Sequence, residues 1–256
     1  MTEVFWNRLT AEEINLRAAA AAMVLLPVAS TEQHGPHLST GVDTFLATEG
    51  CRRTALKLHE LGRPAIVTPT VWMGLAEHHV AFGGTFSLSI GTYHALLRDL
   101  CRSIIRANFR RIVIVNGHGG NIAALNALAT DLAAELQAPI AITTLYNLAH
   151  ASGAYRAILE DQKGVLHACE AETSMMQVVA RDCVRQERLA DAHGTPPEGM
   201  ALGSSPAINV WRSFKELTAS GVLGDARKAS TDKGERLLDS AAGLLATELA
   251  KDLYWS

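Results

Sequence analysis

The stretch RIVIVNGHGGN, residues 111–121, holds a strand and the turn that follows it. Its apolar, mostly β-branched residues run without a break from Ile112 to Val115, which is typical of a strand buried on both faces of a parallel sheet. Glycines on both sides of His118 let the backbone bend sharply and approach a bound group closely. The stretch therefore predicts a strand that delivers a histidine to the carboxyl end of a sheet, where such sheets place their sites.

The rest of the chain alternates short apolar runs with longer amphipathic ones. We predict further strands at residues 23–28, 65–68 and 139–146, and helices at residues 43–61, 92–108, 121–137, 172–182 and 231–253. A proline- and glycine-containing stretch, residues 191–206, is predicted to be loop and, with the segment around Trp211, to shape a pocket. Strands alternating with helices indicate an α/β fold with a mainly parallel sheet covered on both faces, built as a single domain over residues 1–256.

Composition excludes several classes of protein. Hydrophobic residues make up 48% of the chain, enough for a large core, so global disorder is excluded. The net charge of −3 disfavours a nucleic-acid partner. No uncharged apolar stretch is long enough for a membrane span, and the best candidate, residues 18–28, follows an acidic rather than a basic segment. Four cysteines without a CxxC spacing are typical of free thiols in a reducing compartment, so we expect a cytoplasmic protein.

The densest polar cluster, STEQHGPH at residues 30–37, directly follows the first predicted strand. Residues two apart on an extended chain point to the same side, so Glu32 and His34 can aim at one point. Asp43 follows across a turn-rich segment, where the next helix should begin; taken alone, it could simply cap that helix. Glu, His and Asp converging at one strand end are typical of a divalent-metal site, with an ordinary polar loop as the alternative.

His118 occupies the corresponding place after its own strand. A strand-to-helix turn that binds phosphate is an alternative interpretation, but the turn lacks the lysine of a P-loop, and no GxGxxG pattern is present. A lone histidine there would most often be structural. At the same sheet edge as Glu32 and His34, it more naturally completes their site.

Two further segments carry candidate groups. In HACEAETS, residues 167–174, Glu170 and Glu172 would lie about 200° apart on a helix, so only one of them can face a metal. Cys169 between them could be a thiolate ligand or nucleophile, but a small buried thiol is the favoured interpretation. Read as a strand, the segment around His78 and His79 would direct the two rings to opposite sides, so that at most one faces the site.

Taken together, these motifs resemble the creatininase (creatinine amidohydrolase-like) family. The similarity runs, in family order, through residues 26–38 with Asp43, residues 79–85, 116–121 and 167–174, and more weakly through residues 221–225 and Gly234. The resemblance implies a three-layer α/β/α fold, a two-metal site and homo-oligomers that are often hexamers.

Carried over by position, the resemblance implies roles for single residues. Five would hold two divalent ions (Zn, Mn or Fe): Glu32 and His118 the first, His34 and Glu172 the second, and Asp43 both. His167 matches the proton-transfer histidine of the family, and His79 and Gly119 are expected at the substrate. The two cations would lower the pKa of water toward about 7, so that a metal-bound hydroxide exists at neutral pH.

The chain also departs from true creatininases. They carry a further glutamate where this chain has Gly120, a proline where it has Gly83, and tryptophans that have no match before His167. Creatinine is therefore disfavoured as the substrate, and the wider family includes hydrolases of formamides, of a mycofactocin precursor peptide and of sugar-derived ketones. We expect a metal-dependent amidohydrolase that cleaves a C–N bond of a small amide or cyclic amide. The alternatives are one of those other family activities or a non-catalytic metal- or ligand-binding protein on the same scaffold.

Overall fold

The computed structural model describes residues 2–195 and 210–255. Its centre is a four-stranded parallel sheet, in the order β2-β1-β3-β4. The strands are β1 (Met23–Val28), β2 (Ala65–Val67), β3 (Arg111–Asn116) and β4 (Ile140–Thr144). Val28, the last residue of β1, pairs with Asn116, the last residue of β3. The segments that follow these two central strands therefore leave the sheet side by side.

Alternate residues of the strands feed two separate cores, because successive side chains of a strand point to opposite faces. In β1, Met23 and Leu25 join one core, while Val24, Leu26 and Val28 join the other. β3 divides in the same way, and the residues of β1 are all buried. The unbroken apolar runs in the sequence reflect this burial on both faces.

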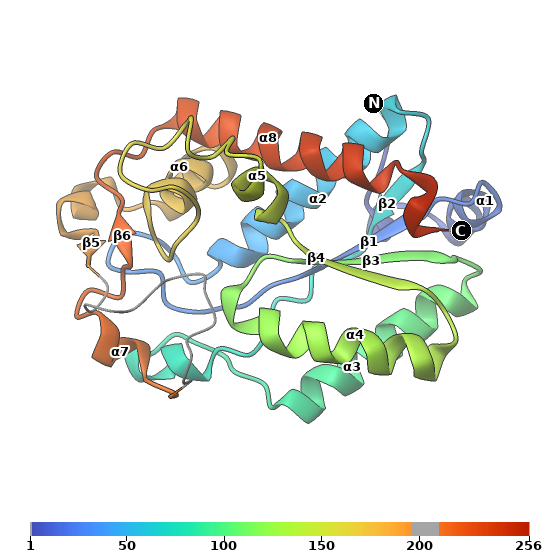
Figure 1. The fold of residues 1–256 in the computed structure, drawn as a ribbon, viewed down its shortest axis with the longest axis horizontal. Coiled ribbons are helices and arrows are strands. Elements are labelled where there is room, and N and C mark those ends of the chain that lie inside the picture. The colour runs from blue at the N-terminus through green and yellow to red at the C-terminus, as the bar shows by residue number, and fades with distance from the viewer. Residues whose placement is uncertain (1, 196–209, 256) are drawn as a thin grey trace.

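Helices cover both faces of the sheet (Figure 1). One face packs against α2 (Val42–Glu60) and α8 (Thr231–Leu249), with α5 (Asn147–Ala151) and α6 (Glu170–Val179) beside them. The other face packs against α3 (Ile90–Arg106) and α4 (Ile122–Leu136), and α1 (Ala11–Ala19) adds Ile14 to this core. These are the three layers of the predicted α/β/α fold, which the structure confirms.

The structure corrects two of the local predictions. Residues 77–82 form a short 3-10 helix rather than a strand; it ends at Gly83 and Gly84, both at positive φ, which side chains of other residues disfavour. Part of the predicted loop forms β5 (His193–Gly194), which pairs with β6 (Gly224–Asp225). Residues 196–206 of that loop lie outside the described part of the chain. The remaining helix, α7 (Phe214–Leu217), begins with a capping box at Ser213 and packs against the 3-10 helix.

Among the described helices, none combines the length and the apolar character that crossing a membrane requires.

Candidate metal centre

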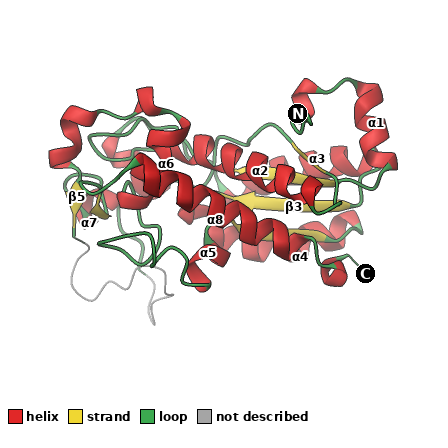
Figure 2. Cartoon of the chain, turned by 90° about the horizontal axis from the view of Figure 1, so that it is seen from above, coloured by secondary structure: helices red, strands yellow, loops and turns green. Residues whose placement is uncertain are grey.

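Three stretches of chain meet beyond the carboxyl ends of the strands. In Figure 2, β3 points toward the end of the molecule that carries α6, β5 and α7. The chain after β1 brings Glu32, His34 and Asp43 to this end, and the chain after β3 brings His118. The first turn of α6 adds Glu172. All five side chains are buried, and together they form what we call the carboxylate–histidine cluster.

Asp43 stands at the centre of the cluster, and its two oxygens face different histidines. Oδ2 lies 3.1 Å from His118 Nδ1, which is also 3.1 Å from Glu32 Oε2. Oδ1 lies 3.3 Å from His34 Nε2, which is 3.9 Å from Glu172 Oε2. The cluster thus contains two groups of ligand atoms that share Asp43, Glu32–Asp43–His118 and His34–Asp43–Glu172. A third group that could hold an ion, Glu32–His34–His167, adjoins them.

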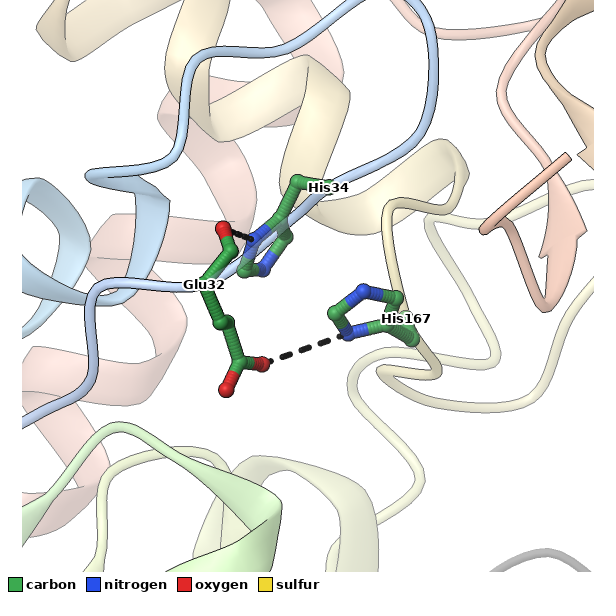
Figure 3. Close-up of side chains that lie close together, drawn as sticks. All are labelled: Glu32, His34 and His167. Atoms are coloured by element: carbon green, nitrogen blue, oxygen red, sulfur yellow. Dashed lines mark hydrogen bonds and ion pairs between the residues drawn. The ribbon is translucent and has the colours of Figure 1, made fainter. Parts of the chain in front are cut away.

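Both histidines of the cluster are oriented by main-chain carbonyl groups. His34 donates from Nδ1 to the carbonyl oxygen of Glu32 at 3.1 Å, as Figure 3 shows, and His118 donates from Nε2 to that of Leu75 at 3.2 Å. Each ring thereby carries its proton on the outer nitrogen. Its inner nitrogen is then the one that can offer a lone pair to an ion, which is the arrangement typical of metal-binding histidines.

Two buried asparagines hold the turn that carries His118. Asn116 accepts from the main-chain N–H of His118 at 3.1 Å and donates to its carbonyl oxygen at 2.7 Å. Asn121 donates to Asn116 and accepts from the main-chain N–H of Leu75, the residue whose carbonyl binds the His118 ring. Asn116 therefore fixes the backbone of His118, and Asn121 fixes Leu75, whose carbonyl oxygen accepts from the His118 ring.

The structure shows where the carboxylates of Asp43, Glu170 and Glu172 point, which the sequence left open. Asp43 is the second residue of α2 and makes no capping hydrogen bond; its carboxylate faces the two histidines instead. Glu172 points into the cluster, whereas Glu170 points away and pairs with Lys233 at 2.6 Å. Glu172 also accepts from the main-chain N–H of Ala168, a residue held at φ +54°. Such strain in a residue other than glycine is common at functional sites.

The donor atoms fit divalent cations. Glu32 Oε2, His34 Nε2 and Asp43 Oδ2 are buried and have no hydrogen-bond partner among the described residues. Burial opposes the charging of His34, yet the surrounding carboxylates of Asp43, Glu172 and Glu32 raise its pKa to about 9. Burial likewise disfavours the charged form of His118, but Glu32 and Asp43 raise its pKa well above the usual range. The carboxylates thus demand positive charge at these two nitrogens, which cations would supply in place of protons.

His167 and His79 lie beside the cluster, outside the two groups that share Asp43, and His167 forms the third possible ligand group with Glu32 and His34. His167 Nδ1 is 3.7 Å from Glu32 Oε1 (Figure 3), and His79 Nε2 is 3.3 Å from the same oxygen. Burial, with the positive charge of neighbouring histidines, lowers the pKa of both rings, that of His79 to about 2. Both rings are therefore neutral, and the ring of Phe214 packs against each.

An open cavity of about 440 Å³ lies next to Leu75, whose carbonyl oxygen binds the His118 ring. Its walls include Leu75, His78 and Trp211. The 3-10 helix brings His78 and His79 to the same region, so the prediction that their rings diverge, made for a strand, is wrong. A Cβ atom on Gly120 would lie 2.4 Å from His118 Nε2 and 2.7 Å from His78 Cε1, whereas Gly119 has open space at that position.

Cys169 is buried, and burial raises the pKa of its thiol to about 12. It therefore stays a thiol at neutral pH, in agreement with the structural interpretation and not with a thiolate nucleophile.

Sequence reasoning missed two residues near the cluster. Gln33 contacts both His79 and His167 through its side chain. Strand alternation would direct Gln33 away from Glu32 and His34, yet its side chain reaches the two rings that lie beside Glu32 Oε1. Phe214 belongs to a short helix far along the chain, and no sequence pattern marks it.

Comparison with known proteins agrees with this picture. The family model "Creatininase: Creatinine amidohydrolase" matches residues 7–249. A mycofactocin precursor peptide peptidase of Mycolicibacterium smegmatis is 33% identical over 84% of this chain and 79% of its own length. A 3-dehydro-scyllo-inosose hydrolase of Thermotoga maritima is 29% identical over 93% and 81%. The creatinine amidohydrolase of Pseudomonas putida is 29% identical over 92% of each chain.

Solved structures show the same likeness. The crystal structure of a creatinine amidohydrolase superimposes with a TM-score of 0.81 at 26% identity and covers 97% of each chain. Another neighbour, with a TM-score of 0.80, 26% identity and coverage of 97% and 98%, is described as a manganese form of creatininase.

Fold, cluster and comparisons together define a metal-dependent hydrolase that acts on carbon–nitrogen bonds. The chain belongs to the creatininase family.

Proposed function

We propose that the protein hydrolyses a C–N bond of a small amide or cyclic amide with two divalent ions held in the carboxylate–histidine cluster. The observation that carries this proposal is that the two carboxylate oxygens of Asp43 face different histidines. Oδ1 lies 3.3 Å from His34 Nε2, and Oδ2 lies 3.1 Å from His118 Nδ1. A carboxylate that offers one oxygen to each of two ligand groups is suited to bridging two ions. Glu32 and His118 would complete the first ion site, and His34 and Glu172 the second.

Divalent ions in such a site activate water at neutral pH and stabilise negative charge on an attacked carbonyl oxygen. The protein supplies the proton transfers. His167 donates from Nε2 to the carbonyl oxygen of Gln33 at 2.9 Å, so its Nδ1 faces the cluster with a free lone pair. That nitrogen can take a proton from the attacking water and pass it to the departing nitrogen of the substrate.

The activities of the relatives and the space around Gly119 and Gly120 narrow the range of candidate substrates. The relatives are described as acting on creatinine, on a precursor peptide and on an inosose. Residue 120 is glycine, so the first ion site lacks the additional carboxylate that the resemblance places in creatininases. A Cβ atom there would lie 2.4 Å from both His118 Nε2 and the carbonyl oxygen of Leu75, so the present packing leaves no room for a glutamate. We therefore favour an amide other than creatinine. Gly119, with open space above its Cα, suits the predicted approach of substrate to the backbone.

The metal content of the purified protein tests this proposal most directly. Protein purified without chelator, or reconstituted with Zn, Mn or Fe, should contain about two divalent ions per chain by elemental mass spectrometry. Glu32→Ala should lose the first ion, and the wild type loaded with the best metal should then be screened against small and cyclic amides, formamides and short peptides. Two ions without turnover of any of these would favour a binding protein on the same scaffold, and no ions would refute the metal centre.

Three broader features belong to the same proposal. We propose that residues 1–256 work as one domain, because helices from both halves of the chain cover one sheet. A cytoplasmic location is supported by four free cysteines. A homo-oligomer, with the hexamer as the form to test, is supported by exposed apolar side chains such as Trp72 and Phe86, which are 45% and 55% exposed. Light scattering coupled to size-exclusion chromatography measures the oligomeric state.

A further inference from the structure

The two carboxylate oxygens of Glu32 have different surroundings. Oε2 faces His118 and Asp43 and has no hydrogen-bond partner among the described side and main chains. Oε1 faces away from them, 3.3 Å from His79 Nε2. Oε2 is thus left for an ion, while Oε1 meets His79, which belongs to none of the three ligand groups, and lies farther, 3.7 Å, from His167 Nδ1.

The hydrogen bonds of the Gln33 side chain determine the tautomer of His79, that is, which ring nitrogen carries the proton. The Oε1 atom of Gln33 accepts from the main-chain N–H of Gly35 at 3.0 Å, so its amide nitrogen is the atom that faces His79. This nitrogen has two protons and three neighbours: His79 Nδ1 at 2.9 Å, His167 Nε2 at 3.0 Å and the carbonyl oxygen of Gly221 at 3.2 Å. The carbonyl can only accept, so it takes one proton.

The second amide proton goes to His79. His167 Nε2 lies 2.9 Å from the carbonyl oxygen of Gln33 and donates to it, so this nitrogen cannot also accept from the amide. His79 Nδ1 therefore accepts, and its proton must sit on Nε2, the nitrogen that faces Glu32 Oε1. This assignment gives both amide protons of Gln33 and both ring nitrogens of His79 a partner, which the opposite tautomer of His79 does not.

Other side chains also pack against the faces of the His79 ring, in addition to the hydrogen-bond partners of its nitrogens. His167 stacks on it with ring centroids 4.4 Å apart, and Phe214 lies at 4.2 Å. His79 is only 1% exposed. A substrate that enters the site has no free edge or face of this ring to touch.

We propose that His79 is a positioning residue for Glu32, held in its Nε2–H tautomer by Gln33, and not the substrate contact that the sequence suggested. By binding Oε1 it turns Oε2 toward the first ion. The proposal rests on the proposed role of Glu32 as a ligand of that ion. Gly221 is part of the arrangement, because it adopts φ +78° and a Cβ atom there would lie 2.1 Å from Gln33 Oε1.

Metal affinity separates the two roles of His79. Apo protein is titrated with Zn²⁺ against a chromogenic chelator, which reports the affinity of each ion without any substrate. His79→Leu should weaken the binding of one ion by about 10–100-fold, the usual effect of losing a hydrogen-bond partner of a metal ligand, and leave the other ion unchanged. Gln33→Met, which removes the amide but keeps the length of the side chain, should weaken the same ion.

A matched pair of variants controls for folding and for loss of polarity. In His79→Gln the amide N–H reaches the place of Nε2 and should restore most of the affinity. His79→Asn is one methylene shorter and reaches only the place of Nδ1, so it should behave like His79→Leu. Circular dichroism confirms that each variant is folded.

Weaker binding of one ion in His79→Leu, Gln33→Met and His79→Asn, with most of the affinity restored in His79→Gln, would support the proposal. Unchanged metal affinity in His79→Leu, accompanied by a raised KM, would overturn it and return His79 to the substrate. Equal losses in His79→Gln and His79→Asn would overturn it too. If the wild type itself binds no ion, the proposed metal centre fails, which the titration shows before any variant is made.

Discussion

Asp43 is the side chain on which both ion sites depend, because it belongs to both ligand groups. We expect Asp43→Ala to lose both ions, whereas Glu172→Ala should lose only the second. Elemental mass spectrometry of the two purified variants, side by side with the wild type, measures this directly. An Asp43→Ala protein with a full metal content would show that the carboxylate does not bridge.

His167 is expected to matter for turnover and not for metal content. Its Nδ1 lies 3.7 Å from Glu32 Oε1 and is the nitrogen left free by the hydrogen bond to Gln33. His167→Ala should slow kcat by about 10²–10⁴-fold, the range for a general acid–base residue, and still bind two ions. Steady-state kinetics on the first substrate found, together with metal analysis, checks both parts; unchanged turnover would remove His167 from the mechanism.

For single residues of the site, the sequence predicted those that directly follow strands and missed those whose position depends on the packing of other segments. Glu32, His34 and His118 could be placed together because β1 and β3 end side by side and parallel strands share an edge. The choice of Glu172 over Glu170 required the family resemblance, since helix geometry showed only that the two diverge. Gln33 and Phe214 could not be assigned, because their partners depend on how distant loops pack and no local pattern encodes that.

Among the elements, α6 and α8 are joined by a buried ion pair. Lys233 of α8 donates to Glu170 and Glu160 at 2.6 Å each and to the carbonyl oxygen of Lys228 at 2.8 Å, while Glu170 is fully buried. Burial disfavours the charged form of Lys233, yet the two carboxylates still raise its pKa. The pair therefore holds the first turn of α6, which carries Glu172, against α8.

Lys233→Met should lower the free energy of unfolding by about 3–5 kcal/mol, because it leaves a buried carboxylate without its cation. Urea unfolding followed by circular dichroism measures the loss. The double variant Lys233→Met/Glu170→Gln should recover much of it, since the buried charge is then gone. A loss below about 1 kcal/mol in the single variant would mean that solvent reaches Glu170 readily.

The 3-10 helix at residues 77–82 shows where reasoning about elements fails. Its six residues, EHHVAF, are too few for a helical period to be recognised, and two adjacent histidines read equally well as part of a strand. What selects the helix is packing, because His79 fits between His167 and Phe214. The long helices and the apolar strands, in contrast, carry their periods in the sequence and were placed correctly to within a few residues.

For the whole molecule, metal binding and stability should be coupled, since the cluster joins loops from β1 and β3 with α2 and α6. An ion that binds only the folded state stabilises it by about 2.7 kcal/mol at a concentration 100 times its Kd. For a chain of this size each kcal/mol corresponds to about 2–4 °C in Tm. Removing the ions with a chelator should therefore lower Tm by about 5–10 °C, measured by calorimetry. An Asp43→Ala protein should show no such shift, and an equal shift in it would place the stabilising ion elsewhere.

The lack of room at Gly120 also limits how this chain can change over time. A Cβ atom there would meet His118 Nε2 and the carbonyl oxygen of Leu75, each at 2.4 Å, and these are the donor and acceptor of the hydrogen bond that orients His118. A single substitution at this position thus damages the existing ligand before any new one can help. Replacing His78 alone does not clear the way, because the obstructing carbonyl belongs to the backbone. An evolutionary route to a larger residue at position 120 must first move the segment around Leu75, so the order of mutations, and not only their number, decides whether this chain can acquire a side chain there.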